Sequence, residues 1–214
     1  MGREQIKVEL IDHMGSDLST VNSARVSFDK EVDTVGDGDV KLIKYLAKHK
    51  HLTPFRHNQI QIRCHAPIFL VRQLGKHQAG LSWNEVSRRY VDSEPEFFIP
   101  DEWRARPDGS IKQGSGGVHL ESEAIVKGMI DTNKHFMELY TGLIEIGVSP
   151  EQARMVLPQS MMTSWYWSGN LLAFAHIYKE RIADGAQLEA QWFAEELDKV
   201  IRPLFPESWS ALVD

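Results

Sequence analysis

The side chains best suited to hydrogen-bond chemistry lie between positions 72 and 90. In a chain of formal net charge -6 they place cationic, anionic and amide groups close together: Arg72, Gln73, Lys76, His77, Gln78, Asn84, Glu85, Ser87, Arg88 and Arg89. Guanidinium groups bind phosphate, and neighbouring amide, carboxylate and guanidinium groups can discriminate the edge of a heterocycle. A solvated helix face would explain each charge taken singly, but the combination favours a nucleotide ligand.

The composition bounds what kind of protein this is. With 214 residues and 42% hydrophobic content, we expect a single domain over 1–214, and the net charge of -6 disfavours a nucleic-acid partner. A single cysteine, Cys64, excludes an internal disulfide framework and a cysteine-only metal cage, which suits a reducing compartment. The N-terminus has no secretory core and the apolar runs are short, so we expect a cytoplasmic protein without a membrane role.

Hydrophobic periodicity predicts the elements that hold this segment. Alternation predicts a strand over 6–10, closed by a turn at 12–15, and a second strand over 59–65 whose polar face meets either solvent or a ligand. Asp39 is predicted to cap a helix that ends in the basic stretch 49–51. Pro67 predicts the first residue of a helix reaching Gly75, so the basic cluster begins where that helix ends.

The second half of the chain is mainly helical in pattern. Apolar spacing, capping residues and prolines predict helices over 121–146, 150–157, 169–182 and 186–201. Between the two halves, 96–100 predicts a short strand and 106–117 predicts a mobile insertion. The strands are few and widely spaced, so the predicted fold class is α+β.

Motifs along nearly the whole chain resemble those of the flavin-dependent thymidylate synthases. The most specific is Arg72-Gln73, followed by Lys76-His77-Gln78 and Ser82-x-Asn-Glu-x-Ser-x-Arg-Tyr90. The others fall in the family's order and approximate spacing: Ser23–Phe28, His51-x-Thr-Pro-Phe-x-His57, Ala66–Phe69, Glu96–Pro100, Ala153–Pro158, Asn170, Arg181 and Ala186-Gln187-x-Glu189. A lone Ser-x-Arg carries no weight, but an ordered set of this kind is specific.

The resemblance implies an enzyme that converts dUMP to dTMP. Its carbon donor would be 5,10-methylenetetrahydrofolate, and its hydride source FAD reduced by NADPH. The fold would be a small, mainly antiparallel sheet packed with long helices, and the assembly a homotetramer with shared active sites. Arg181 would be the catalytic residue, because a guanidinium beside N3 and O4 stabilises the negative charge that makes C5 of uracil nucleophilic. Water or another group would take the proton, since arginine stays charged.

The resemblance also assigns the binding residues. Those implied to bind the flavin are His51, Thr53, Lys76, His77, Gln78, Asn84, Glu85, Asn170 and His176. Those implied to bind the nucleotide are Arg72, Gln73, Glu85, Ser87, Arg88, Arg89, Arg154 and Arg181. His51 or another histidine could orient folate and relay protons.

The chain departs from the family in the cofactor loop. Lys76-His77-Gln78 stands where Arg-His-Arg is usual, and one extra residue lies among Ala79, Gly80 and Leu81. Lysine lacks the bidentate fork of arginine and Gln78 carries no charge, so we expect an anionic ligand to be bound more weakly or in a different geometry. Leu172 also occupies a position that is often basic. Two alternatives follow: C5 methylation or hydroxymethylation of another pyrimidine nucleotide, and a flavin- and nucleotide-binding subunit without turnover.

Several chemistries are disfavoured by residue context. Cys64 lies on the apolar side of its strand and lacks the Pro-Cys-His setting of the cysteine-dependent thymidylate synthases, so we expect a buried thiol. Ser87 has no evident histidine partner and is expected to bind phosphate or ribose. The nine histidines show no zinc-helix spacing, so we expect no metal. The aromatic run 165–167 could stack on flavin, but core packing is the commoner role.

Overall fold

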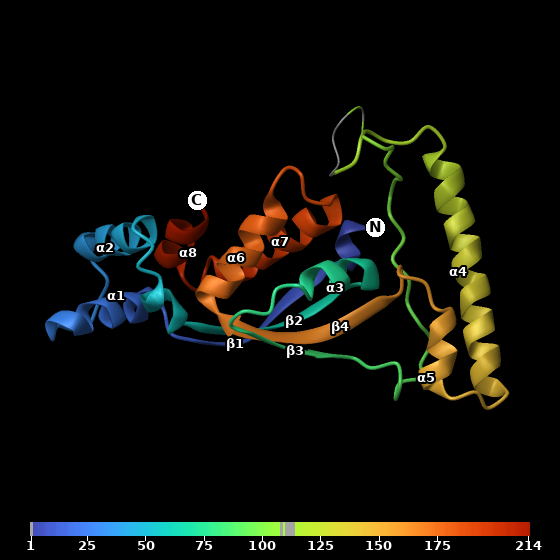
Figure 1. Cartoon of the computed structure of the whole chain (residues 1–214), viewed down its shortest axis with the longest axis horizontal. Helices are drawn as coiled ribbons and strands as arrows, with labels where there is room; N and C mark the ends of the chain where they lie inside the picture. Colours follow the sequence, from blue (N-terminus) through green and yellow to red (C-terminus); the bar gives the residue numbers. More distant parts are fainter. Residues whose placement is uncertain (1, 108, 110–113) are drawn as a thin grey trace.

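The computed structural model describes residues 2–107, 109 and 114–214 and is built on one antiparallel sheet (Figure 1). Its strands are β1 (Lys7–Met14), β2 (Gln59–Pro67), β3 (Leu81–Glu85) and β4 (Met162–Asn170), in the order β1-β2-β4-β3. The sheet and its helices confirm the predicted α+β class. The single-domain assignment stays a prediction.

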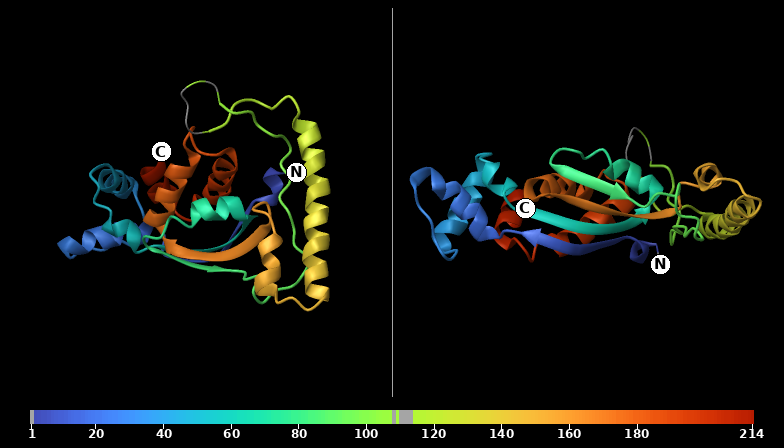
Figure 2. Two further views of the ribbon diagram at one scale, coloured as in Figure 1. Left: turned by 45° about the vertical axis from the view of Figure 1, so that its right-hand side comes forward. Right: turned by 90° about the horizontal axis from the view of Figure 1, so that it is seen from below.

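Seven of the described helices fall into three groups. Their bounds are α1 (Asp17–Arg25), α2 (Asp37–Lys48), α3 (Ile68–Leu74), α4 (Ser122–Glu145), α5 (Pro150–Ala153), α6 (Leu171–Ile182), α7 (Leu188–Ile201) and α8 (Pro206–Val213). Helices α3, α6 and α7 cover one face of the sheet, while α1 and α2 lie beyond one end and α4 and α5 beyond the other (Figures 1 and 2). Helix α8 contacts α2 and α6. In the described part of the chain, no helix is long and apolar enough to cross a membrane.

Aromatic side chains fill the space between the sheet and its helices. Trp165 and Trp167 on β4 are 1% and 0% exposed, whereas Tyr166 between them points to the opposite face and is 45% exposed. Trp83 on β3 stacks on Trp165 with ring centroids 4.5 Å apart, and Phe193 of α7 stacks on the same indole. Core packing is therefore confirmed as the role of both tryptophans of the 165–167 run.

Strand β2 alternates as its sequence predicts. Ile60, Ile62 and Cys64 are fully buried, and the side chains between them lie on the face that carries no described helix. Burial raises the pKa of the Cys64 thiol well above its ordinary value, so the group stays protonated at neutral pH. The expectation of a buried thiol is confirmed, and this position is unsuited to a nucleophile.

Several predicted boundaries are correct and others are wrong. The helices predicted over 121–146, 169–182 and 186–201 correspond to α4, α6 and α7, each within about two residues. The turn predicted at 12–15 is wrong, because β1 continues to Met14 through a bulge between Leu10 and Asp12. The strand predicted over 96–100 is reduced to one isolated bridge, between Phe97 and Met161.

Two helix starts also differ from expectation. Asp39 does not cap α2: Gly36 does, and Asp39 lies three residues inside, where its carboxylate accepts a hydrogen bond from the Gly36 N–H at 3.0 Å. This hydrogen bond, followed by the pairing of the same carboxylate with Arg25 of α1, holds the Asp39 pKa below its usual value. The short helix predicted over 150–157 is split into α5 and a 3-10 turn, η4 (Arg154–Val156).

Other elements were not predicted at all. These are α1, α8, β3 and β4. Strand β3 lies within the 72–90 segment, whose polar residues suggest a ligand site. Only Leu81 and Trp83 are apolar in its five residues, which is too few to indicate a strand by alternation. Residues 108 and 110–113 of the predicted mobile insertion lie outside the described residues, so its mobility stays a prediction.

The contact between β3 and β4 depends on the absence of a side chain at Gly169. A Cβ there would lie 2.7 Å from the Gly80 carbonyl oxygen and 2.5 Å from a methyl carbon of Leu81. We expect Gly169→Ala to lower the free energy of unfolding by about 1–3 kcal/mol, measured by urea denaturation, because the two strands must separate. Gly142→Ala, in open space on α4, is the matched control and should raise stability by about 0.5–1 kcal/mol. Equal effects of the two substitutions would contradict this account.

Candidate active site

The site is formed where the chain leaves α3 and returns as β3. Helix α3 ends at Leu74, and the loop folds tightly, with the His77 N–H donating to the Leu74 carbonyl at 3.0 Å and the Leu81 N–H donating to the Gln78 carbonyl at 3.3 Å. Gly80 has φ +74°, and a Cβ on it would lie 2.6 Å from the side-chain nitrogen of Asn170. The loop is therefore pressed against the point where β4 becomes α6.

Arg181 reaches this loop from the last turn of α6. Its Nε and Nη2 donate to His77 Nε2 at 3.0 and 2.9 Å, which leaves Nη1 outside this contact. The His176 ring lies 5.6 Å from His77, edge to face. Burial, followed by the charge of Arg181 and by His176, lowers the His77 pKa to about 4, with Glu180 opposing the shift. His77 is therefore a neutral acceptor at pH 7 and orients the guanidinium.

Two adjoining cavities open beside this pair. One, of about 660 Å³, is lined by Arg72, Gln73, Gly75, Lys76 and Arg181. The second, of about 580 Å³, shares Arg72 and Gly75 with the first and is lined also by Val71, His77, Gln78, Leu81, Trp83, Glu85 and Trp167. One cavity is thus cationic and the other has indole rings in its walls. Together they suit an anionic ligand that carries flat rings.

The residues after Trp83 divide between the two faces of the sheet. Glu85 lines the second cavity and accepts a hydrogen bond from the Thr163 hydroxyl at 3.2 Å. Asn84 is exposed and points to the opposite face, because successive residues of a strand alternate. The expectation that these two residues line one pocket is therefore not met within a single chain.

The basic pair that follows β3 is already engaged. Arg88 donates to the carbonyl oxygens of Ser93 and Glu94, and its guanidinium lies 5.8 Å from the centre of the Tyr140 ring on α4. Arg89 donates to the Ser87 hydroxyl at 3.3 Å. The role of Ser87 in binding stays a prediction.

Some predicted residues lie away from the two cavities. His51 and Thr53 are exposed near the 3-10 turn η3 (Thr53–Arg56), and Arg154 is exposed on η4, where its Nε donates to the Glu151 carbonyl. None of these three lines either cavity. Asn170 caps α6 by accepting a hydrogen bond from the Ala173 N–H at 2.9 Å. Binding roles for these residues stay predictions.

Sequence reasoning missed the groups behind Gln73. The Gln73 side chain donates to Gln187, Gln187 donates to Glu189, and Glu189 pairs with Arg104. The motif Ala186-Gln187-x-Glu189 contributes to the family resemblance but indicates no role for either side chain. Trp83 and Trp167, which line the second cavity, were also not predicted as site residues. The sequence feature that could have indicated them is the presence of tryptophan in two segments of alternating pattern, 81–85 and 162–170.

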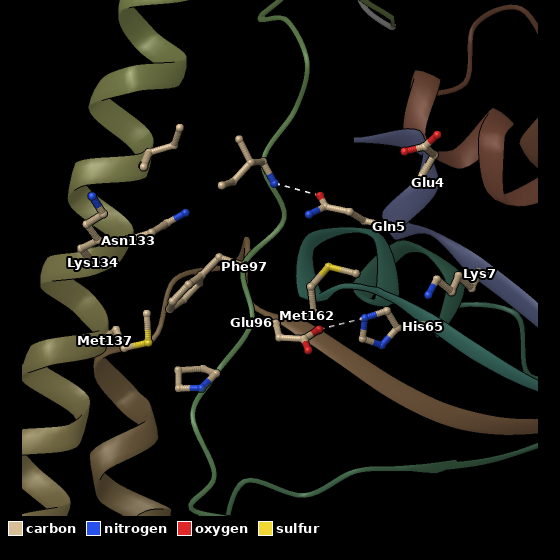
Figure 3. A pocket seen from close by; sticks show the side chains of 13 residues that line it. Glu4, Gln5, Lys7, His65, Glu96, Phe97, Asn133, Lys134, Met137 and Met162 are labelled. Atoms are coloured by element: carbon tan, nitrogen blue, oxygen red, sulfur yellow. Dashed lines mark hydrogen bonds and ion pairs between the residues drawn. The ribbon is translucent and has the colours of Figure 1, made fainter. Parts of the chain in front are cut away.

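A further cavity of about 590 Å³ lies between α4 and the edge of the sheet (Figure 3). On its wall His65 faces Glu96 at 3.5 Å and contacts the Ser164 hydroxyl at 2.8 Å. Desolvation lowers the pKa of His65, against the opposing effect of Glu96. None of the predicted site residues lines it, so we place the candidate site at the Arg181 cavities. No cluster of three potential metal ligands occurs in the described ranges.

The sheet and its helices define an α+β protein, and its cationic and indole-lined cavities suit a small anionic ligand. A family model described as thymidylate synthase complementing protein matches residues 9–207. The flavin-dependent thymidylate synthase of Kosmotoga olearia is 37% identical over 210 residues, covering 97% of this chain and 90% of its own. That of Thermus thermophilus is 36% identical over 204 residues, covering 95% and 74%.

Solved structures agree with this assignment. The UMP/dUMP methylase PolB from Streptomyces cacaoi, bound with 5-Br dUMP, has a TM-score of 0.84 and 31% sequence identity, covering 96% of this chain and 94% of its own. The same methylase bound with 5-Br UMP has a TM-score of 0.85 and 30% identity, covering 97% and 93%. This chain therefore belongs to the flavin-dependent thymidylate synthases, a family of methyltransferase enzymes.

The low pKa of His77 predicts a pH dependence of stability. A histidine whose pKa falls from 6.5 in the unfolded chain to about 4 in the folded chain binds its proton more readily when unfolded. The stabilising contribution is complete above about pH 6.5 and is lost as the pH falls towards 4. In urea unfolding across this window, His77→Asn should lose part of the decline in stability.

The matched control is His135→Asn, which changes an exposed histidine on α4. It should keep the wild-type dependence on pH. Indistinguishable slopes for His77→Asn and the wild type would show that folding does not lower the His77 pKa, which would contradict the predicted pH dependence.

Proposed function

We propose that this enzyme methylates dUMP reductively at C5 to give dTMP, with 5,10-methylenetetrahydrofolate as carbon donor and FAD reduced by NADPH as hydride source. The observation that carries the proposal is the orientation of Arg181 by a neutral His77 at the wall of a cationic cavity. The names of the relatives, which are flavin-dependent thymidylate synthases and a UMP/dUMP methylase, support the substrate and the flavin.

Arg181 is proposed as the electrostatic catalyst. Because Nε and Nη2 are held by His77, Nη1 is available to approach O4 and N3 of a uracil ring. At an effective dielectric constant of about 20, a charge pair 4 Å apart interacts by about 4 kcal/mol, enough to favour the anionic form of the ring. The proton leaves to water or another group, since the guanidinium accepts none.

The remaining residues are proposed to bind and orient. Arg72 and Lys76 line the cationic cavity and supply charge for the phosphate, with Gln73 on the same wall. The partly buried indole of Trp83, together with His77 and Gln78, lines a cavity whose chemistry fits the flat rings of a flavin. A flavin bound there would supply the hydride, while the protein holds the pyrimidine in place and excludes water.

A homotetramer with shared sites is part of the proposal. His51, Thr53 and Arg154 do not line the two cavities of one chain, which is expected if they serve the site of a neighbouring subunit. Asn84 on the opposite face of β3 fits the same arrangement. Ser87, Arg88, Arg89, Asn170 and His176 keep their assigned binding roles as proposals.

The second candidate function is methylation of UMP. It is favoured by the similarity to PolB, which is described as a UMP/dUMP methylase and is known bound with both brominated nucleotides. The changed loop at Lys76-His77-Gln78 fits a ligand site that differs in shape or charge from the usual one.

The direct test measures product identity under anaerobic conditions. Enzyme loaded with FAD and reduced by NADPH is mixed with methylenetetrahydrofolate and dUMP, UMP or dCMP, and both flavin reoxidation and product mass are followed. We expect reoxidation with dUMP and a product of the mass of dTMP. Formation of only 5-methyl-UMP would favour the second candidate. Bound flavin that no nucleotide reoxidises would indicate a subunit without turnover.

Substitution of Arg181 tests its proposed role. Arg181→Ala should lower kcat by about 10²- to 10³-fold, the usual effect of removing one donor that stabilises transition-state charge. Arg181→Lys should retain an intermediate rate, because it restores charge without the planar fork. Flavin absorbance should remain in both variants, which separates lost catalysis from lost cofactor. Near-wild-type turnover by Arg181→Ala would overturn the assignment.

A further inference from the structure

A buried carboxylate lies behind the cationic cavity. The side chain of Glu189, in the first turn of α7, is only 5% exposed, and both of its oxygens accept hydrogen bonds from Arg104 Nη2 at 2.7 and 2.8 Å. Arg104 is in turn held by Ser115, whose hydroxyl lies 2.7 Å from Nε. Both oxygens thus face the Arg104 guanidinium, which only donates hydrogen bonds, so the Glu189 carboxylate acts as an acceptor.

This carboxylate fixes the orientation of two side-chain amides, first that of Gln187 and through it that of Gln73. Gln187 lies 2.8 Å from Glu189 and must turn its NH₂ group to the carboxylate, which leaves its carbonyl oxygen facing Gln73. Gln73 must then present its own NH₂ to Gln187, at 2.5 Å. The order of donors is therefore set by charge, and reversing either amide would place two acceptors against each other.

The hydrogen bonds that link Glu189 through Gln187 to Gln73 form a relay, and its last group, the Gln73 amide, lies on the cavity wall. With its NH₂ turned to Gln187, Gln73 has its carbonyl oxygen free of any donor among residues 2–107, 109 and 114–214. Gln73 lines the cavity together with Arg72, Lys76 and Arg181, all of which are donors. The wall thus combines cations with one acceptor of fixed direction.

We propose that Glu189 and Gln187 are positioning residues that make Gln73 accept a hydrogen bond from the pyrimidine nucleotide. The matching donor is either the N3–H of the neutral uracil ring as it binds, before Arg181 favours the anionic form, or the 3′-hydroxyl of the deoxyribose, since both are neutral donors on the same ligand. If it is N3–H, the relay also selects uracil over cytosine, whose N3 is an acceptor. The inference rests on the proposed function, because it requires a nucleotide in the Arg181 cavity.

The test compares two glutamines of the same region. Gln187→Met removes the relay at nearly constant volume, whereas Gln191→Met is the matched control, because Gln191 binds the carbonyls of Ala183 and Ala186 and does not contact Gln73. We expect Gln187→Met to raise the Kd and KM for dUMP about tenfold with kcat within about twofold. Gln191→Met should change all three by less than about twofold.

Two altered ligands identify the donor. Wild-type enzyme should bind either N3-methyl-dUMP or 2',3'-dideoxyuridine monophosphate about tenfold more weakly than dUMP, depending on which donor Gln73 meets. Gln187→Met should show no such loss for that ligand, because the two changes remove the same hydrogen bond. Equal losses in both proteins, or no loss in the wild type, would overturn the relay.

Glu189→Gln tests the fixed polarity directly. An amide at position 189 can donate as well as accept, so the relay is no longer held in one orientation. The difference in Kd between dUMP and the altered ligand should therefore be smaller in Glu189→Gln than in the wild type. If this variant does not fold, because Arg104 loses its partner, the comparison of Gln187→Met with Gln191→Met still decides the proposal.

Failure of the relay is distinguishable from failure of the proposed function. Wild-type enzyme that binds neither dUMP nor UMP would refute the function itself. Wild-type binding with an unchanged Kd in Gln187→Met would refute only the relay.

Discussion

The packing of β4 between β2 and β3 is the constraint on which the candidate site depends. Strand β4 carries the two buried tryptophans, receives the stacked Trp83 from β3, and runs into α6 at Asn170. Because α6 begins at Leu171, directly after β4, the position of β4 sets where Arg181 lies. Because β3 is paired to β4 through Gly169, the same strand sets where the loop before β3 lies. His77 and Arg181 meet because the loop that carries His77 leads into β3, which pairs with β4, and the helix that carries Arg181 follows β4 directly.

Electrostatics at this site depend on one neutral group among cations. Arg72, Lys76 and Arg181 bring positive charge to one cavity of an acidic chain, and a protonated His77 would add repulsion. Its lowered pKa avoids that repulsion and turns the imidazole into an acceptor for the guanidinium. Gln78 carries no charge where arginine is usual in the family, so the positive charge beside the two cavities comes from Arg72, Lys76 and Arg181.

Helices and strands could be predicted from the sequence where their apolar residues repeat regularly, and could not where the repeat is short or interrupted. Helix α4 and strand β2 were correctly predicted because each repeats its apolar period over several turns or residues. Strand β3 was missed because five residues give too little alternation, and β4 because its polar residues and glycine obscured a buried aromatic face. Asp39 was misplaced by three residues, since a carboxylate inside the first turn and one at the cap give the same sequence signal.

The sequence by itself determined the fold class, the family and the segment that carries the ligand chemistry, because these depend on residue types and on spacing within short stretches. It also supplied Gln187 and Glu189 without a role. Only the tertiary structure decided that Arg181 lies against His77, that Asn84 and Glu85 face opposite sides, and that Gln73 meets a glutamine 114 positions away. Such contacts depend on how packed elements bring distant segments together, and the direction of each hydrogen bond depends on the charge of the group at its end.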